Sequence, residues 1–265
     1  MKIVRFLSDD GRPRHGRLTE DGRAHPLIGD LFDHPTFAAE TMPVTTLLPP
    51  VEPPNIFAIG RNYRKHVEET GARLPEQPLV FLKPTTSLLA PAGTILLPNA
   101  APNEVDFEAE LAIVIGRVTR QVPANRALDA VLGYTCANDV SARDCQRNDK
   151  QWSRAKGFDT FCPIGPCLVT PDEFDPDRCA IRTRLNGEIM QEANTEEMLR
   201  PCGELISYLS HQFTLLPGTL ILTGTPAGVG MARRPPRFLR DGDRIEVELD
   251  GIGILRNRVS REAGG

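Results

Sequence analysis

Three carboxylates in this chain have a spacing that could hold a hard metal ion. Glu108 and Glu110 stand at the entrance to the apolar run LAIVI, and residues i and i+2 of a strand share one face, about 6.6 Å apart. Asp139 interrupts the otherwise neutral stretch GYTCANDV. Three oxygen donors without a Cys or His ligand pattern favour Mg²⁺ or Mn²⁺, which leave coordination positions open for substrate oxygens. A solvated strand end is the alternative for the glutamate pair, because acidic side chains are mostly exposed.

A histidine and a glutamate form a second candidate pair. His66 and Glu69 lie three positions apart, and on a helix such residues share one face. The carboxylate could therefore orient the imidazole or help it to activate water. An ordinary surface histidine is the alternative.

Polar residues that follow Asp139 could form a site for anions and carbonyl groups. Arg143 and Gln146 occur in SARDCQ, and Lys156 occurs in RAKGF. Thr225 belongs to the glycine-rich segment TGTPAGVG at 223–230, which could present backbone N–H groups and a hydroxyl to a ligand. A tight structural turn is the alternative for that segment.

Common signatures of other chemistries are absent from the sequence. It contains no G-x-G-x-x-G, G-x-x-x-x-G-K-[ST], G-x-S-x-G or H-E-x-x-H motif. These absences disfavour dinucleotide redox chemistry, P-loop hydrolysis and a serine nucleophile.

Composition predicts a strand-rich protein that does not bind nucleic acid. The 265 residues include 24 Pro and 22 Gly, which favour short, sharply turned segments over long helices. The net charge of -4 provides no basic surface for a polyanion. The six cysteines form no C-x-x-C pair and are expected to be reduced and mostly buried. Without a secretory signal or an apolar membrane span, a soluble cytoplasmic protein is expected.

The elements that must position these residues are mainly short strands. A small unit at 1–50 begins with the strand MKIVRFL and two hairpins at its Asp-Gly turns, and a proline-dense connection separates it from a main domain at 51–265. Six further runs predict strands, at 56–60, 79–83, 94–98, 107–116, 219–224 and 243–259. Helical spacing occurs at 63–69, 124–131 and 197–210.

Taken together, these segments resemble the fumarylacetoacetate hydrolase family, specifically its short bacterial and mitochondrial-type members. The similarity extends over nearly all of residues 55–260, with several long motifs in the right order. The matching segments are GRNYRKHVEE, FLKPTTSL, EVDFEAELAIVIG, YTCANDVSARDCQ, QWSRAKGFDTFCPIGP, ILTGTPAGVG and GDRIEVELDGIGILRN.

The resemblance implies a fold and a role for each candidate residue. The fold would be a mixed β-roll with a small N-terminal domain, usually in a homodimer. The implied metal ligands are Glu108, Glu110 and Asp139. The implied lid-helix pair is His66 and Glu69, and the implied substrate-side residues are Arg143, Gln146, Lys156 and Thr225.

The implied reaction is metal-dependent hydrolysis of a C–C bond in a 2,4-dioxo acid of the acylpyruvate or fumarylpyruvate type. His66, oriented by Glu69, would activate the water, and Lys156 would stabilise developing enolate charge. The same site could instead isomerise a 2-hydroxyhepta-2,4-diene-1,7-dioate or decarboxylate a 2-oxo acid such as oxaloacetate. The presence of both His66 and Glu69 favours hydrolysis, because isomerisation needs no activated water. A non-catalytic small-molecule binding protein is the alternative of another class.

One basic segment has no assigned role. The stretch MARRPPRFLRD at 231–241 carries Arg233, Arg234, Arg237 and Arg240. A solvated loop is the default interpretation, and the sharper hypothesis is that these arginines border the cleft and steer dianionic substrates.

Overall fold

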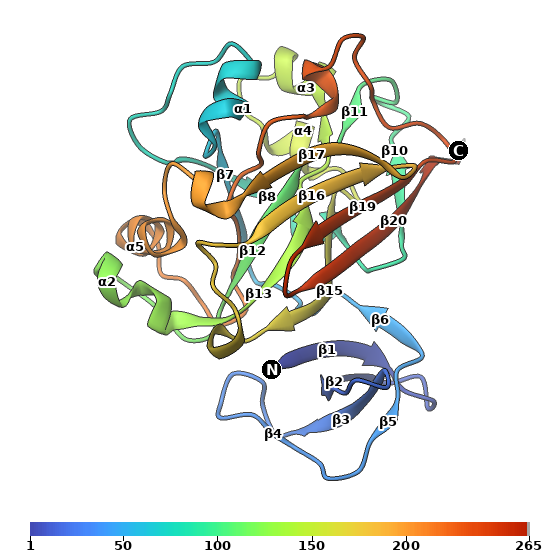
Figure 1. The fold of residues 1–265 in the computed structure, drawn as a ribbon, viewed down its shortest axis with the longest axis vertical. Coiled ribbons are helices and arrows are strands. Elements are labelled where there is room, and N and C mark those ends of the chain that lie inside the picture. The colour runs from blue at the N-terminus through green and yellow to red at the C-terminus, as the bar shows by residue number, and fades with distance from the viewer. Residues whose placement is uncertain (264–265) are drawn as a thin grey trace.

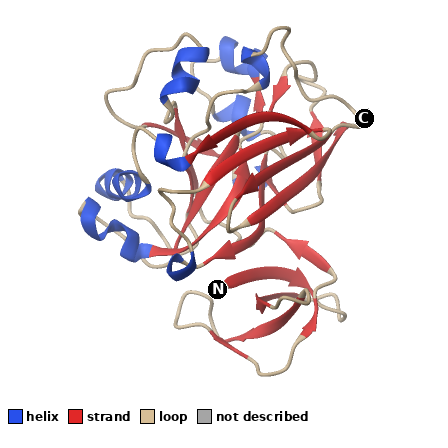
Figure 2. Cartoon of the chain, in the orientation of Figure 1, coloured by secondary structure: helices blue, strands red, loops and turns tan. Residues whose placement is uncertain are grey.

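The computed structural model describes residues 1–263, and strands dominate it (Figures 1 and 2). Within these residues the strands form a 13-stranded, a 5-stranded and a 2-stranded sheet. Most neighbouring strands are antiparallel. The parallel pairs are β18 (Leu220–Leu222) with β7 (Ile56–Gly60), β10 (Thr94–Leu97) with β20 (Gly253–Arg261), and β9 (Leu88–Leu89) with β15 (Cys162–Val169). The predicted α+β, strand-rich fold with mixed sheets is therefore confirmed.

The first 50 residues form a small antiparallel unit at one end of the molecule (Figure 1). Strands β1 (Lys2–Leu7), β2 (Pro13–Leu18) and β3 (Arg23–Ile28) are joined by the two predicted hairpins. Three short strands complete the unit: β4 (Thr36–Phe37), β5 (Met42–Pro43) and β6 (Thr46–Leu48). Because β1 also pairs with β15, the sheet continues into the rest of the chain, and a domain boundary near residue 50 stays a prediction.

The central part of the large sheet has the strand order β1-β15-β13-β12-β18-β7-β8. Strand β12 (Ala109–Ile115) lies between β13 (Val131–Asn138) and β18 (Leu220–Leu222), and all its residues are buried. An apolar run without alternation is typical of a strand covered on both faces. The flanking strands are β7 (Ile56–Gly60), β8 (Leu79–Lys83) and β15 (Cys162–Val169), and β9 (Leu88–Leu89) pairs with β15.

The five-stranded sheet covers β12 and β13, in front of them in Figure 1. Its order is β10-β20-β19-β16-β17. One hydrophobic core contains Leu111 of β12, Ile181 of β16 and Val247 of β19, so the two sheets share it. The strands are β10 (Thr94–Leu97), β16 (Ala180–Leu185), β17 (Glu188–Asn194), β19 (Arg244–Leu249) and β20 (Gly253–Arg261).

Short helices and turns lie at the edges of the sheets (Figure 2). The α-helices are α1 (Arg64–Glu69), α2 (Ala124–Ala127), α3 (Arg143–Asn148), α4 (Ser153–Gly157) and α5 (Cys202–Gln212). Five 3₁₀ turns occur at Thr85–Ser87, Leu128–Ala130, Pro171–Glu173, Thr195–Glu197 and Gly230–Ala232. The two-stranded sheet pairs β11 (Val105–Asp106) with β14 (Ser141–Ala142). No helix within residues 1–263 is long and apolar enough to span a membrane.

Two predicted helices differ from the structure. The helix expected at 197–210 is wrong at its start, because α5 begins only at Cys202, after Pro201. Proline disfavours the helical conformation of the residue before it, so the chain enters the helix only beyond this point. The helix expected at 124–131 is one α-turn followed by a 3₁₀ turn, and Val131 already belongs to β13.

Besides several strands of two or three residues, four longer strands were not predicted from the sequence, namely β13, β15, β16 and β17. Strand β15 reads CPIGPCLV, and its prolines and glycine are typical of a turn. The strand nevertheless pairs with β13, with an irregular register between Tyr134 and Cys136. All six cysteines are free and buried, as expected.

Candidate active site

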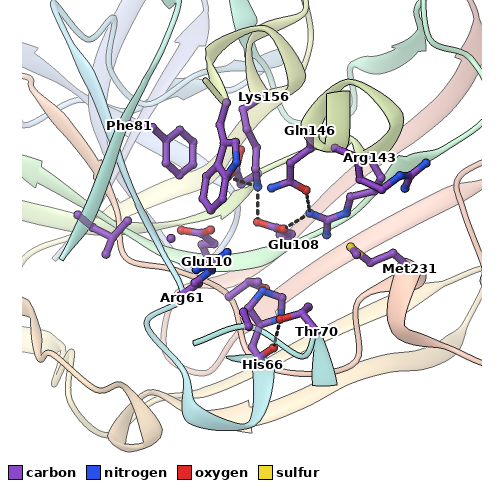
Figure 3. A pocket seen from close by; sticks show the side chains of 17 residues that line it. Arg61, His66, Thr70, Phe81, Glu108, Glu110, Arg143, Gln146, Lys156 and Met231 are labelled. Atoms are coloured by element: carbon purple, nitrogen blue, oxygen red, sulfur yellow. Dashed lines mark hydrogen bonds and ion pairs between the residues drawn. The ribbon is translucent and has the colours of Figure 1, made fainter. Parts of the chain in front are cut away.

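A cavity of ≈ 210 Å³ collects the predicted site residues (Figure 3). All of them except Glu69 line it, and Glu69 contacts the lining residue His66. They come from segments far apart in the sequence, namely α1, the β12–β13 pair, α3, α4 and the loop after β18. The residues that the sequence marks as candidates therefore also lie together in the fold.

The three acidic residues form a buried cluster. Carboxylate oxygens of Glu108, Glu110 and Asp139 lie within 4.8 Å of one another. The β12–β13 register brings them together, because Ala109 is opposite Asn138 and the Asp139 N–H donates to the Glu108 carbonyl at 2.9 Å. The residues are 5%, 1% and 0% exposed, so the alternative of a solvated strand end is wrong.

Two lysines contact this cluster. Lys156 Nζ donates to Glu108 Oε2 at 2.6 Å and to Asp139 Oδ2 at 2.8 Å. Lys83 Nζ donates to Asp139 Oδ1 at 2.5 Å. Burial lowers the pKa of Lys156, but the carboxylates of Asp139 and Glu108 outweigh it, and the net pKa is raised. Lys156 therefore keeps its positive charge beside the cluster.

The carboxyl groups of the cluster differ in their electrostatic surroundings. Burial raises the pKa of Glu108, but Lys156 and Arg143 outweigh it and hold that pKa at about 2. Glu110 accepts one hydrogen bond, from the Gly224 N–H at 2.6 Å, and has no basic ion-pair partner within residues 1–263. Burial, Asp139 and Glu108 raise the pKa of Glu110 well above its usual value. Glu110 thus has too little positive charge around it to favour its ionised form.

This arrangement fits a divalent cation. All three donors are carboxylates, they lie close enough to share one ion, and Lys156 and the Gly224 N–H compensate negative charge at Glu110 only in part. Hard cations such as Mg²⁺ and Mn²⁺ prefer oxygen ligands of this kind. The donor set contains no Cys or His from residues 1–263, which makes a soft-metal site a poor fit.

The histidine pair lies across the cavity from Lys156 (Figure 3). His66 is only 8% exposed, so the alternative of a surface histidine is wrong. Glu69 Oε1 is 2.8 Å from His66 Nδ1, and Glu69 Oε2 accepts the Gly228 N–H at 2.8 Å. Since a carboxylate only accepts hydrogen bonds, Nδ1 carries a proton, and in the neutral imidazole Nε2 then has the free lone pair. The geometry therefore fixes the tautomer that can act as a base.

Arg143 is held by a carboxylate that the sequence analysis did not single out. Asp106 accepts from Arg143 Nε at 2.8 Å and from the backbone N–H groups of Gly230 and Met231 at 2.8 and 3.0 Å. Another guanidinium nitrogen of Arg143 donates to Gln146 Oε1 at 2.9 Å. The sequence did contain a signal for this residue, since Asp106 continues the every-second-residue acidic pattern of Glu108 and Glu110 backwards.

Two more residues of the site were missed. Lys83 ends the strand LVFLK, and a single charge at the end of an apolar strand was an available signal. Gln191 donates from Nε2 to Thr225 Oγ1 at 2.8 Å and accepts the Ala109 N–H at 2.9 Å. This amide links the Thr225 loop to the strand that carries Glu110. No local pattern marks Gln191, because its partners come from other strands.

The glycine-rich segment is both a tight turn and a wall of the site. Gly228 has φ +105°, and a Cβ there would lie 2.2 Å from the Met190 carbonyl oxygen. The close approach lets the Gly228 N–H reach Glu69, while Thr225 in the same segment lines the cavity. The two alternatives for this segment therefore coexist.

The basic segment at 231–241 does not border the cavity with its arginines. Met231 is the one residue of the segment that lines it. Arg233 donates to the Met190 carbonyl at 2.6 Å, and Arg237 contacts both carboxylate oxygens of Asp243 at 3.0 Å. The expectation that these arginines border the cavity is wrong, because Arg233 and Arg237 bind other parts of the chain and none of the four lines the cavity. Steering of dianionic substrates by their charge stays a prediction.

Comparison with known proteins agrees with this geometry. A family model described as fumarylacetoacetate (FAA) hydrolase C-terminal matches residues 55–260, and one described as Rv2993c-like, N-terminal matches residues 1–50. Protein Rv2993c of Mycobacterium tuberculosis is 45% identical over 99% of both chains. The mitochondrial oxaloacetate tautomerase Fahd2a of Rattus norvegicus is 45% identical over 82% of this chain and 69% of its own.

A crystal structure extends the likeness to three dimensions. The 5-carboxymethyl-2-hydroxymuconate delta-isomerase from Mycobacterium smegmatis is 42% identical and superposes with a TM-score of 0.89, covering 99% of this chain and 100% of that one. The family match, the sequence identity and the shared fold lead to one conclusion: the chain belongs to the fumarylacetoacetate hydrolase family.

Proposed function

We propose that this protein is a divalent-metal-dependent enzyme that transfers a proton within small 2-oxo acids, interconverting keto and enol forms. The observation that carries the proposal is the tautomer-fixed base His66, which faces a buried carboxylate cluster across a small cavity. The volume of ≈ 210 Å³ lies below the range of roughly 300–1,000 Å³ for drug-sized ligands, which favours a compact acid. Relatives described as an oxaloacetate tautomerase and a delta-isomerase support proton transfer over other reactions.

The metal would be held by Glu108, Glu110 and Asp139 and would be Mg²⁺ or Mn²⁺. When bound, such an ion supplies Lewis-acid stabilisation of negative charge that develops on a substrate oxygen. The remaining steps belong to the side chains of this chain.

Lys156, Arg143 and Gln146 would bind and orient the substrate. Lys156 is protonated between Glu108 and Asp139, so its ammonium group can donate toward an oxygen on which charge grows. The Arg143 guanidinium is oriented by Asp106, and it in turn orients Gln146. Thr225 Oγ1 accepts from Gln191, which leaves the Thr225 hydroxyl hydrogen available to a ligand.

His66 would move the proton. Nε2 removes a proton from the carbon next to the 2-oxo group, and a proton is delivered to the 2-oxo oxygen, so one C–H bond breaks and one O–H bond forms. Glu69 stabilises the imidazolium that exists between these two events. No electrons leave the substrate, and the net change is isomerisation.

Hydrolysis of a C–C bond in an acylpyruvate or fumarylpyruvate is the second candidate. The same His66–Glu69 pair could deprotonate a water molecule, which supports this reaction. The water oxygen would form a bond to the distal carbonyl carbon, the C3–C4 bond would break, and its electron pair and a proton would end on C3. Pyruvate and a second carboxylate would leave. Decarboxylation of oxaloacetate is a third use of the same groups, and a purely binding role is disfavoured because the complete set is present.

The test compares substrates on one enzyme preparation. With Mg²⁺ or Mn²⁺ present, we expect faster decay of the enol absorbance of oxaloacetate, without pyruvate formation. Acetylpyruvate and fumarylpyruvate, assayed for pyruvate, report hydrolysis. If enol decay is unchanged while either acylpyruvate is cleaved, hydrolysis replaces proton transfer as the function. If metal-loaded protein changes none of these acids, the enzyme proposal is wrong.

We also propose a homodimer, as the family resemblance implies, and a cytoplasmic location, as expected from the sequence. Light scattering on purified protein tests the dimer, and a mass of one chain would contradict it. Fractionation of the producing cells tests the location.

A further inference from the structure

Arg61 stands at the cavity in a backbone conformation that side chains rarely adopt. Its φ is +59°, in the left-handed region that is uncommon for residues other than glycine. Gly60 precedes it, and a Cβ on Gly60 would lie 2.6 Å from Cζ3 of Trp152. The backbone is therefore strained at Arg61, where the side chain lies beside the Trp152 ring. Strained backbone of this kind is concentrated at functional sites.

A row of cations and rings forms one wall of the cavity. The Arg61 guanidinium carbon lies 5.8 Å from the Trp152 ring, and Trp152 meets Phe81 edge-on at 5.4 Å. Phe81 in turn lies 5.5 Å from Lys156 Nζ, which contacts the carboxylate cluster. All four side chains line the cavity. The wall therefore leads from the reactive end of the site to Arg61, with apolar surface between.

The charge of Arg61 differs from that of the other cavity arginines. Arg143 is paired with Asp106 and Glu108 at 2.8 Å. Arg147 is paired with Glu104 at 2.7 Å. The Arg61 guanidinium makes no hydrogen bond or ion pair with any residue in 1–263, and it is half-buried. A positioned guanidinium without a carboxylate is suited to receive one from a ligand, since the planar fork binds carboxylates bidentately.

We propose that Arg61, held against Trp152, binds the distal carboxylate of a 2-oxo dicarboxylic acid and so selects dicarboxylates over monocarboxylates. The inference rests on the proposed function, because the 2-oxo end must lie at the carboxylate cluster for the distal end to reach Arg61. It adds a specificity residue that acts away from the reacting atoms.

The test uses two ligands that differ only at the distal group. Oxaloacetate and 2-oxobutanoate share a carbon skeleton, with a carboxylate in the first where the second has a methyl. Binding to metal-loaded protein is followed by the fluorescence of Trp152, the only tryptophan of the chain. In Arg61→Gln, we expect the preference for oxaloacetate, as a ratio of Kd values, to fall roughly 10- to 100-fold. The ratio of kcat/KM values should fall in parallel through KM.

Arg64→Gln is the matched control, because Arg64 is an exposed arginine on the same segment that does not line the cavity. Arg61→Lys keeps the charge without the planar fork and should restore part of the preference. A structural role for Arg61 would weaken both ligands equally and leave the ratio unchanged, which would overturn the inference, as would an equal loss in Arg64→Gln. If wild-type protein neither binds nor converts either acid, the proposed function fails, and this inference fails with it.

Discussion

Asp106 and Glu110 are two buried carboxylates on one short stretch of chain, and they are in opposite situations. Asp106 accepts four hydrogen bonds, three from backbone N–H groups and one from Arg143. Glu110 accepts one, and it faces two other carboxylates. Both are at most 1% exposed, so burial alone does not distinguish them.

The difference separates a structural acid, Asp106, from Glu110, the functional acid of the proposed metal site. A buried carboxylate whose lone pairs are all satisfied stabilises the loop and the arginine that it holds. A buried carboxylate that lacks donors and has like charges beside it is unfavourable unless a cation joins it. The protein therefore maintains an electrostatic deficit at Glu110 and none at Asp106, which is the arrangement expected where a metal ion binds.

Neutralising the functional acid should have the largest effect on activity. Glu110→Gln removes one proposed metal ligand, and we expect kcat/KM to fall roughly 10³-fold or more, since metal stabilisation of developing charge is worth several kcal/mol. The free energy of unfolding without metal should stay within about 1 kcal/mol or rise, because a like charge is removed. Metal at 100 times its Kd should add about 2.7 kcal/mol of stability to the wild type and none to the variant. A strongly destabilised, fully active variant would reverse the comparison.

Neutralising the structural acid should chiefly lower stability. Asp106→Asn keeps one acceptor oxygen but turns an amide NH₂ toward N–H groups, and it leaves Arg143 short of negative charge. We expect a loss of about 3 kcal/mol in the free energy of unfolding, measured by denaturant titration. Asp129→Asn, which breaks the exposed Arg126–Asp129 pair, is the control and should cost less than about 1 kcal/mol. An equal, small decrease in the free energy of unfolding of both variants would show that Asp106 contributes little to stability.

Changing the carboxylate behind the base should affect turnover more than binding. In Glu69→Gln the amide can donate to His66 Nδ1, which moves the imidazole proton to Nε2 and removes the free lone pair. We expect kcat to fall roughly 10²-fold or more with substrate Kd little changed. His211→Gln, on the exposed end of α5, is the histidine control and should leave both values unchanged. A drop in affinity alone would mean that the pair positions substrate and moves no proton.

His15, a histidine far from the cavity, is expected to have the smallest effect, which concerns the pH dependence of stability. Burial lowers the pKa of His15 from 6.5, although the Pro50 carbonyl 3.0 Å from Nε2 opposes this. Because the folded pKa lies below the unfolded one, the unfolded chain binds more protons between the two values, and stability falls as the pH drops below about 6.5. Between about pH 7 and pH 5 we expect the His15 contribution to lower the free energy of unfolding by under about 1 kcal/mol. The pH-dependent decrease should be smaller in His15→Gln, as measured by denaturant titration at each pH. Identical pH slopes in both proteins would contradict this.

Local patterns predicted part of this site, and the missing part has a common cause. The i, i+2 spacing of Glu108 and Glu110 and the i, i+3 spacing of His66 and Glu69 are short-range features, and the structure has both. Lys83 and Gln191 were not predicted because their hydrogen-bond partners are distant in the sequence. Asp139 is 56 residues from Lys83, and Ala109 is 82 residues from Gln191. Strands β13 and β15 escaped because glycine and proline are typical of turns, while their pairing depends on neighbouring strands.

The sequence by itself determined which chemical groups are available, the short spacings between them and the family to which they belong, because these are properties of contiguous residues. Only the tertiary structure decided that Asp106 is satisfied and Glu110 is not, and that within residues 1–263 Arg61 has no carboxylate partner while Arg143 has two. The physical reason is that the cost of a buried charge depends on donors and charges supplied by distant segments. Strand register and loop packing place those partners, and neither can be predicted from the residues of a single segment.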